Sequence, residues 1–238
     1  MQSSNHFLDT LPAKARALID GDLERVTLKR DATLAETGRT VAWVLLPTNS
    51  IISVIAVMEN GDQVESRTIG RESGFGLLHA LGSPYSFERV IVQVGGEAWQ
   101  IRTQALRRAA AASPELTDAI VRHAQATIVQ TTQTNACNTL HPTPPRLARW
   151  LLMTQDRLGG DPVVPLTQEH LSIMLGVQRT TVTTLAASLQ AQKIIRYSRG
   201  KIRILDREAL KGRACECYEA VTLAVDRILA DRLERAGD

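Results

Sequence analysis

Cysteine is scarce in this chain, whose 238 residues include only three, Cys137, Cys215 and Cys217. Three thiols form no disulfide framework, and an odd number fits a reducing compartment. No cysteine precedes Cys137. Aromatic residues make up 4% of the chain, so we expect a core packed mainly by leucine, isoleucine, valine and alanine.

Long apolar runs are also lacking. No stretch approaches the roughly 18 to 20 apolar residues of a membrane helix, and residues 1–10 lack the basic and apolar segments of a signal peptide. The apolar fraction (44%) and the charged fraction (22%) lie near globular averages, which argues against a disordered or fibrous protein. We therefore expect a cytoplasmic protein without a membrane partner, and its length allows one large domain or two smaller ones.

Positive charge is concentrated in one segment, although the whole chain carries only +3 at pH 7. Residues 142–212 carry a net charge of +6, whereas residues 1–141 carry −1 and residues 213–238 carry −2. A basic segment of this kind is typical of a module that contacts nucleic-acid phosphates. A solvated basic face without a partner explains the charge equally well, so the pattern of residues must decide.

Short β-branched runs broken by turn residues fill residues 26–101. Residues 51–58 and 64–69 flank Asn60-Gly61, which supplies the positive φ angles of a tight hairpin turn. Residues 90–94 and 98–101 are interpreted as a second pair of strands around Gly95-Gly96. Because no helical pattern separates these strands, we expect an α+β protein in which residues 1–112 form a small barrel or jelly roll rather than an open parallel sheet.

A long helix is predicted next, over residues 113–141. Ser113 is a favourable cap residue, and Pro114 is favourable in the first turn of a helix. The prolines from Pro142 onward end the helix, because proline cannot continue it. One stripe of this helix is apolar or small, and its members are Leu116, Ile120, Ala124, Thr127 and Ile128. The stripe packs either on its own domain or against a second chain as a dimer seam. A further helix is predicted over residues 146–158.

Residues 166–189 have the pattern of a helix-turn-helix. Thr167 caps a predicted helix over residues 168–175, and Gly176 follows, where a positive φ lets the chain turn sharply. A second helix begins after residues 177–179. The inward positions of the two helices are Leu171, Met174, Leu175, Val182, Leu185, Ala186 and Leu189. The alternative is a generic helical hairpin with a polar face.

The outward positions of the second helix favour contact with DNA bases. They are Gln178, Arg179, Thr180, Thr183 and Thr184, which surround the helix N-terminus, the end that enters a major groove. Arg179 has the geometry to bind O6 and N7 of guanine with two hydrogen bonds. Residues 194–204 are predicted to be a hairpin, or wing, with Arg199 and Lys201 placed to contact phosphate.

The motifs LGVQRTTV (residues 175–182) and IIRYSRGKIRI (residues 194–204) resemble the winged helix of the cyclic-AMP receptor protein (Crp/Fnr) regulators of bacteria. The resemblance extends to the whole predicted layout of a cyclic-nucleotide-binding-like β-roll, a dimerisation helix and a C-terminal domain. It implies that this last domain, residues 142–238, binds DNA and ends in a further helix. It implies a homodimer, a palindromic operator in double-stranded DNA and contact with RNA polymerase. It also implies base reading by Arg179, Thr180 and Thr184, and phosphate contacts by Thr167 and Gln168. The best-known members have Glu and Arg where this chain has Thr180 and Thr184, so we expect a different operator.

The resemblance also indicates an effector region, with altered chemistry. Arg71, Glu72 and Arg89 lie where nucleotide-binding members hold the ribose and the cyclic phosphate, but Arg89 is displaced by one place and Glu88 stands in the place of the phosphate arginine. We therefore expect another small ligand, or none, in place of a cyclic nucleotide. An iron–sulfur cluster is not expected, because the family's clusters use thiolates near the N-terminus. Haem is not expected, because His79 is a lone histidine in a predicted loop.

Two further interpretations concern catalysis and metal binding. Cys215 and Cys217 alone make a poor metal site, since no other Cys or His lies near them in the sequence, so we predict no metal. A catalytic barrel would need clustered metal-ligand histidines, a Ser-His-Asp set or a phosphate-binding glycine loop, and none is evident. We therefore predict that the protein is not an enzyme. A ligand-gated adaptor whose helix-turn-helix contacts proteins remains an alternative.

Overall fold

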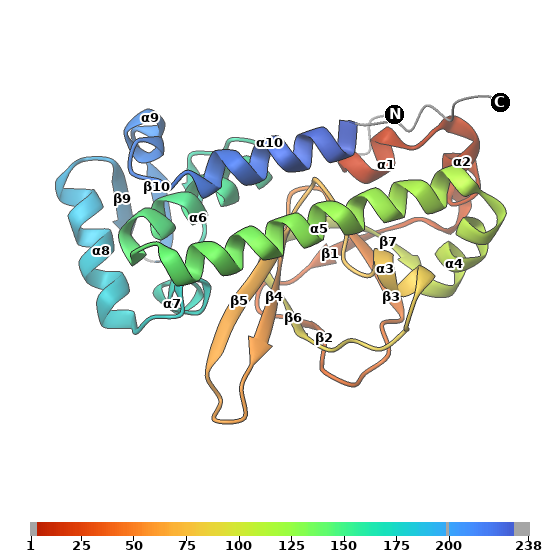
Figure 1. Cartoon of the computed structure of the whole chain (residues 1–238), viewed down its shortest axis with the longest axis horizontal. Helices are drawn as coiled ribbons and strands as arrows, with labels where there is room; N and C mark the ends of the chain where they lie inside the picture. Colours follow the sequence, from red (N-terminus) through yellow and green to blue (C-terminus); the bar gives the residue numbers. More distant parts are fainter. Residues whose placement is uncertain (1–3, 199, 231–238) are drawn as a thin grey trace.

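The computed structural model describes residues 4–198 and 200–230, and it combines an N-terminal β-roll with a C-terminal winged helix (Figure 1). Three short segments precede the roll: α1 (His6–Thr10), α2 (Ala13–Ala17) and a 3-10 turn (Asp20–Asp22). One antiparallel sheet has the order β1 (Glu24–Leu28), β7 (Gly96–Arg102), β3 (Trp43–Pro47). The other has the order β2 (Thr33–Ala35), β6 (Arg89–Val94), β4 (Ile51–Val57), β5 (Gln63–Ile69).

The predicted β4–β5 hairpin is confirmed, but its turn is longer than expected. Val57 pairs with Gln63, so residues 58–62 form the loop. Gly61 has a φ of 88°, whereas Asn60 does not adopt a positive φ and instead accepts a hydrogen bond from the Asp62 amide through its side chain. A side-chain turn of this kind replaces the two-residue turn that Asn-Gly suggested.

The second predicted strand pair is wrong. Strands β6 and β7 exist, but they belong to different sheets. At Gly95, between them, a Cβ atom would lie 3.1 Å from the Leu28 carbonyl oxygen and 3.1 Å from the Arg30 amide nitrogen. The glycine therefore serves a close approach of backbone where the chain crosses between the two sheets, and not a hairpin turn.

Helix α5 (Pro114–Leu140) is the long helix predicted from the sequence, and Ser113 caps it by accepting a hydrogen bond from the Leu116 amide. Leu116 and Ile120 are fully buried in a cluster with α1 and α4 (Thr103–Ala112), so this part of the stripe packs on its own domain. Ile128 is 63% exposed. The apolar stripe of α5 is therefore divided between the chain's own core and the surface.

The C-terminal part begins with α6 (Thr143–Arg157), three residues earlier than predicted, because its prolines occupy the first turn, where no amide hydrogen is needed. A small sheet of order β8 (Val163–Val164), β10 (Lys201–Ile204), β9 (Ile195–Ser198) packs with α7 (Gln168–Leu175), α8 (Arg179–Ala191) and α9 (Arg207–Lys211). Trp150, Leu171, Met174 and Val182 are among its fully buried residues.

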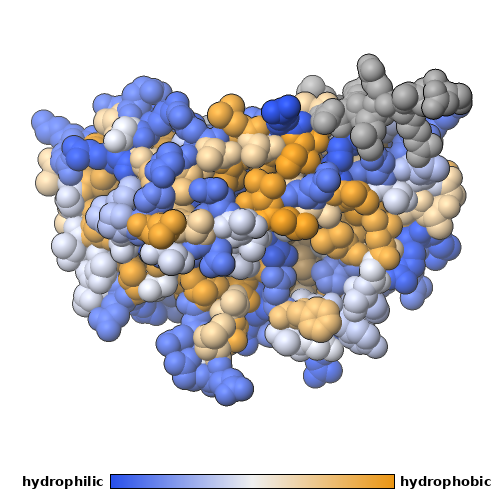
Figure 2. All heavy atoms as spheres, viewed as in Figure 1, coloured by the Kyte–Doolittle hydropathy of each residue, from blue (hydrophilic) through white to orange (hydrophobic). Residues whose placement is uncertain are grey.

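The last described helix, α10 (Cys217–Ala230), runs back along α5 (Figure 1). Apolar side chains gather along the face that α5 and α10 form, which Figure 2 shows in the same orientation. Large apolar side chains are exposed on both helices: Val121 (44% exposed) and Ile128 on α5, and Leu223 (70% exposed) on α10. In the described part of the chain, no helix is both long enough and apolar enough to span a bilayer.

Candidate nucleic-acid interface

The two helices α7 and α8 form the predicted helix-turn-helix, and local sequence explains each boundary. Thr167 accepts a hydrogen bond from the His170 amide, and the His170 side chain reaches back to the Thr167 amide, which completes a capping box. Gly176 ends α7 with a φ of 63°, a conformation that a residue with a Cβ rarely adopts. Helix α8 begins three residues later, at Arg179, so its first turn is fixed relative to α7.

The predicted base-reading residues lie together on the surface. All five are exposed along the N-terminal half of α8: Gln178, Arg179, Thr180, Thr183 and Thr184. The opposite side of α8 is anchored, since Val182 and Ala186 are buried, Leu189 is 8% exposed and Leu185 is partly buried. The helix therefore presents an uninterrupted polar edge to solvent.

The side chains of this edge make only weak contacts within the chain. Arg179 forms an ion pair of 3.0 Å with Glu169, and both side chains are more than 60% exposed. Gln168 donates a hydrogen bond of 3.0 Å to the Thr183 hydroxyl. An exposed ion pair contributes about 0 to 1 kcal/mol, so Arg179 can exchange Glu169 for another acceptor at little cost.

The wing lies beside the start of α7. Lys201 pairs with Ser198 across the hairpin and is exposed, while a Cβ on Gly200 would lie 3.4 Å from Cγ2 of Thr167. The wing tip is thus next to the Thr167 cap and the partly buried Gln168, as a shared phosphate contact requires. The predicted contact Arg199 lies outside the described residues.

Two further arginines of the wing were missed by the sequence interpretation. Arg196 on β9 and Arg203 on β10 are exposed and directly opposite each other. Like charges at opposite positions of a strand pair destabilise it, unless an anion lies between them or close by. The alternation of Ile195-Arg196 and Ile202-Arg203 was the available signal, because it places both arginines on one face.

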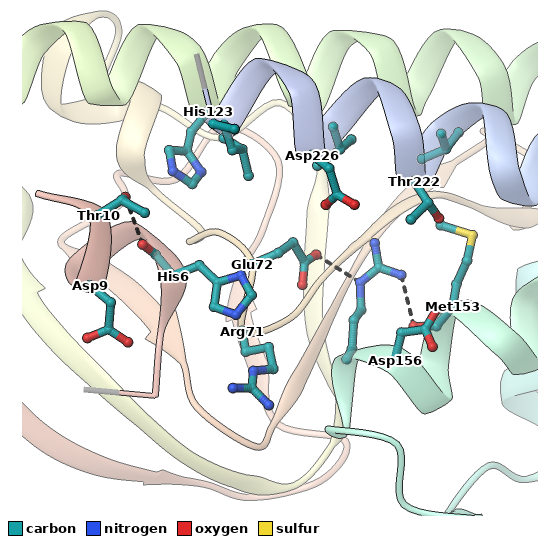
Figure 3. Close-up of a pocket in the computed structure, with 15 residues that line it drawn as sticks. His6, Asp9, Thr10, Arg71, Glu72, His123, Met153, Asp156, Thr222 and Asp226 are labelled. Carbon is teal, nitrogen blue, oxygen red and sulfur yellow. Dashed lines mark hydrogen bonds and ion pairs between the residues drawn. The ribbon is translucent and has the colours of Figure 1, made fainter. Parts of the chain in front are cut away.

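The predicted effector residues do not converge in one place. Arg71 and Glu72 line a cavity of about 640 Å³ between α1, α6 and α10, as Figure 3 shows. Arg89 is not among its lining residues and forms an ion pair of 3.1 Å with Glu36. The cavity also contains His123, whose pKa is lowered to about 4 because burial disfavours its charged form.

Glu72 forms an ion pair with a residue of the C-terminal part. Its carboxylate binds the Arg157 guanidinium at 2.8 Å and accepts a hydrogen bond from the Gly70 amide. Burial alone would raise the pKa of Glu72, but Arg157 and the backbone hydrogen bonds hold it below its ordinary value. This buried ion pair therefore links the roll directly to α6.

The space between the roll and α5 is small. The cavity lined by Ser73, His79 and Thr127 measures about 50 Å³, whereas small-ligand sites usually measure about 300 to 1,000 Å³. Beside it, Glu88 and Arg67 form two parallel hydrogen bonds of 2.8 and 2.9 Å. His79 belongs to the short helix α3 (Leu77–Leu81) instead of the predicted loop, and its ring lies 5.7 Å from that of Phe75.

The interpretation of Cys215 and Cys217 as a pair without other ligands is wrong. The structure brings Cys137 and His141 to them, and the ligand atoms of all four residues lie within 4.8 Å of one another. The signal was present in the sequence as two short spacings, Cys-x3-His at the end of α5 and Cys-x-Cys before α10. Nothing in the sequence placed the two motifs together, since more than 70 residues separate them.

The C-terminal part is similar in sequence to a known domain: residues 145–213 match the Crp-like helix-turn-helix domain. Over 81% of its length, the chain is similar in structure to FixK2 from Bradyrhizobium japonicum, of which 98% is covered (TM-score 0.70, 14% identity). A transcriptional regulator of the Crp/Fnr family from Eubacterium rectale is also similar (TM-score 0.68, 16% identity, 89% of this chain and 98% of that one). A regulator of the same family from Thermus thermophilus gives a TM-score of 0.65 at 21% identity, over 80% of this chain and 98% of that one. Identities this low show a shared fold. A search of curated proteins gave no match.

Proposed function

Because the fold of the chain and the sequence of residues 145–213 are those of the Crp/Fnr regulators, we propose that this protein is a homodimeric, sequence-specific DNA-binding transcription regulator. The observation that carries the proposal is the exposed polar edge of α8. In this proposal residues 1–112 sense, residues 113–141 dimerise and residues 142–238 bind DNA.

The edge of α8 has the chemistry of direct base reading. Arg179 would bind guanine, and the threonines Thr180, Thr183 and Thr184 offer a hydroxyl to base edges and a methyl group to thymine. Gln178 extends the same edge at the helix N-terminus. Thr167, Gln168, Arg199 and Lys201 would hold the flanking phosphates, with Arg196 and Arg203 added by the geometry of the wing.

A second copy of the chain supplies the second half-site. The exposed positions of α5 follow a spacing of four and three residues, from Val121 through Gln125, Ile128 and Thr132 to Asn135. This is the spacing of a helix that pairs with another helix, and its positions include the exposed apolar residues Val121 and Ile128. Two α8 helices related by such a dimer axis fit half-sites about 34 Å apart on a palindromic operator, where RNA polymerase would be the further partner.

The roll would act without a cyclic nucleotide. Glu88 occupies the place of a phosphate ligand, is itself bound by Arg67, and adjoins a cavity of about 50 Å³. The larger cavity at Arg71 and Glu72 has a volume suited to a small ligand. Arg89 would contribute to a ligand site only if its ion pair with Glu36 opened.

The test begins with selection of bound genomic fragments, followed by measurement of affinity for the selected operator by fluorescence anisotropy. Arg179→Ala should weaken operator binding by about 5- to 150-fold, because a two-hydrogen-bond contact with guanine contributes about 1 to 3 kcal/mol. Binding to random DNA should change far less. Arg39→Ala removes one exposed arginine from the roll and serves as the matched control, with little effect expected.

Salt dependence and mass provide two further checks. The logarithm of the affinity should fall linearly with the logarithm of salt concentration, and Lys201→Ala should reduce that slope by about 0.9. Wild type and Arg179→Ala should both sediment as dimers. Salt-independent binding, or equal loss of operator affinity in Arg39→Ala, would refute direct reading by α8.

A further inference from the structure

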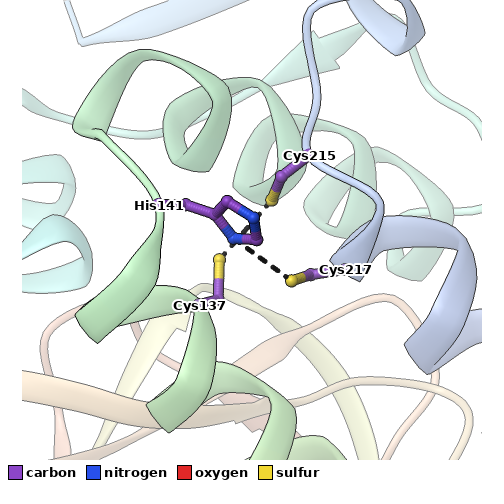
Figure 4. A group of neighbouring side chains, drawn as sticks. All are labelled: Cys137, His141, Cys215 and Cys217. Carbon is purple, nitrogen blue, oxygen red and sulfur yellow. Dashed lines mark hydrogen bonds between the residues drawn. The ribbon is translucent and has the colours of Figure 1, made fainter.

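Four side chains that the proposed function does not use meet at the junction of α5 and α10 (Figure 4). Cys137 lies in the last turn of α5, and His141 is the residue at which that helix ends. Cys215 and Cys217 come from the turn before α10 and from its first residue. The three cysteines are buried, with exposed fractions of 0%, 8% and 1% in sequence order.

The distances between these atoms match one small cation with four ligands. Sγ of Cys137 lies 3.5 Å from Sγ of Cys215, and Sγ of Cys217 lies 3.5 Å from Nδ1 of His141. Ligand atoms about 2.3 Å from one ion at tetrahedral angles lie about 3.8 Å apart. An iron–sulfur cubane would need more widely separated thiolates, because its ligands surround several iron atoms.

Neighbouring groups orient the four side chains in the way a metal site requires. Nε2 of His141 lies 3.1 Å from a carboxylate oxygen of Glu216, so its hydrogen is donated to that oxygen and the lone pair of Nδ1 faces the sulfurs. A carboxylate behind a histidine ligand is a common second partner in metal sites. Nε2 of Gln133 donates a hydrogen bond of 3.0 Å to Sγ of Cys217, which helps to fix the position of that sulfur.

A buried positive charge beside the four side chains also favours a bound metal with thiolate ligands. Arg149 is fully buried, and its charge acts on both Cys137 and Cys215. Within the described residues, two of its three nitrogens have no hydrogen-bond partner, and the third lies 3.5 Å from the Thr134 hydroxyl. A buried cation needs a compensating anion. A divalent ion with three thiolates and a neutral histidine carries one negative charge, which balances that of Arg149.

We propose that Cys137, His141, Cys215 and Cys217 bind one Zn²⁺ ion, which joins the end of α5 to the start of α10. Thiolate and imidazole ligands in tetrahedral order, closed by four protein groups, characterise structural zinc sites. Binding releases the thiol protons to solvent, and the ion keeps its charge throughout. The site does not depend on the proposed function, since it is defined by ligand geometry alone.

The test uses the full-length wild-type chain, prepared in the reduced state from zinc-supplemented cultures. Elemental analysis should find one zinc per chain, with iron and copper below a tenth of that. A mercurial reagent that caps thiols should release one zinc for every three thiols modified. After exchange, Co²⁺ should give the visible bands of a tetrahedral ion and thiolate-to-metal charge transfer.

Two conservative variants keep the test independent of misfolding. Glu216→Gln leaves all four ligands in place and should weaken zinc affinity by about 10- to 100-fold with unchanged stoichiometry at saturation. Glu208→Gln, at an exposed position of α9, is the matched control and should bind zinc as wild type does. Cys215→Ser should remove part of the cobalt charge-transfer intensity if the variant folds.

The results that would overturn the zinc site are equally concrete. One is a folded, reduced wild-type chain that takes up neither zinc nor cobalt. Another is stoichiometric iron or copper that zinc cannot displace. Equal zinc affinity in Glu216→Gln and wild type would contradict coordination through Nδ1 of His141.

Discussion

Glu65 makes the stability of this protein depend on pH in a direction opposite to that of most carboxylates. It lies on β5, fully buried, where the Ser53 hydroxyl and Nε2 of Gln93 both donate hydrogen bonds to Oε2. Its other oxygen, Oε1, has no partner among the described residues. Burial raises the pKa of Glu65 from 4.5 to about 8, against the opposing effect of these hydrogen bonds and of Arg157.

The direction of the effect follows from proton binding. Between pH 4.5 and 8 the folded state keeps a proton that the unfolded state has released, so the free energy of unfolding falls as pH rises. Each pH unit in this window changes it by about 1.4 kcal/mol. From pH 5 to pH 7.5 the ionisation of Glu65 in the unfolded chain should therefore lower the free energy of unfolding by about 3 kcal/mol.

Glu65→Gln isolates this contribution, because glutamine has nearly the same shape and does not titrate. Urea unfolding of variant and wild type at pH 5, 6, 7 and 7.5 gives a difference in unfolding free energy at each pH. That difference should change by about 3 kcal/mol in favour of the variant as pH rises, while contributions of other groups cancel. Glu59→Gln, at the exposed hairpin tip, is the control and should give a flat line. A flat line for Glu65→Gln as well would refute the assigned pKa.

Substitutions of Glu72 and His123 test two further buried titratable groups. Glu72→Gln leaves Arg157 without its carboxylate, and we expect urea unfolding to show a destabilisation of about 3 kcal/mol, whereas Glu36→Gln, which breaks the exposed pair with Arg89, should cost under about 1 kcal/mol. His123 has a pKa of about 4 in the fold, so its contribution is complete above pH 6.5 and is lost as pH falls toward 4. Wild type should therefore lose about 2 kcal/mol more unfolding free energy than His123→Gln between pH 6.5 and 4.5, and an equal loss in the two proteins would contradict the shift.

The helix-turn-helix could be predicted because its signals are local. The bounds of α7 were predicted correctly, since a cap such as Thr167 and a positive-φ glycine such as Gly176 act within one turn of the residues they order. The spacing of apolar residues by three and four positions also predicted the buried side of α8. These features need no knowledge of distant contacts.

The roll was harder because strand existence and strand pairing have different causes. Residues 90–94 and 98–101 were recognised as strands from composition, but their partners lie elsewhere in the chain. The two glycines that suggested a hairpin serve close backbone approaches: at Gly96 a Cβ would lie 2.9 Å from the carbonyl oxygen of Asn49. Helix α4 was missed, and so was the metal-ligand cluster, because it assembles only when α10 folds back on α5.

The contacts between the roll and the C-terminal part differ greatly in strength, which limits how the two can move. Nε2 of His170 lies 2.9 Å from a carboxylate oxygen of Asp31, but the Asp31 side chain is 68% exposed, so breaking this contact costs little free energy. The Glu72–Arg157 pair is largely buried, and a Cβ on Gly70 would lie within 2.8 Å of the Arg157 side chain. The Glu72–Arg157 pair is therefore the stronger of these two polar contacts, and it adds to the apolar contacts that Ile51 and Val94 of the roll make with the C-terminal core. A ligand can shift such an equilibrium only by binding the two arrangements with different affinity. The cavity beside Glu72 is where a small molecule would meet that requirement, because its lining includes both members of the pair.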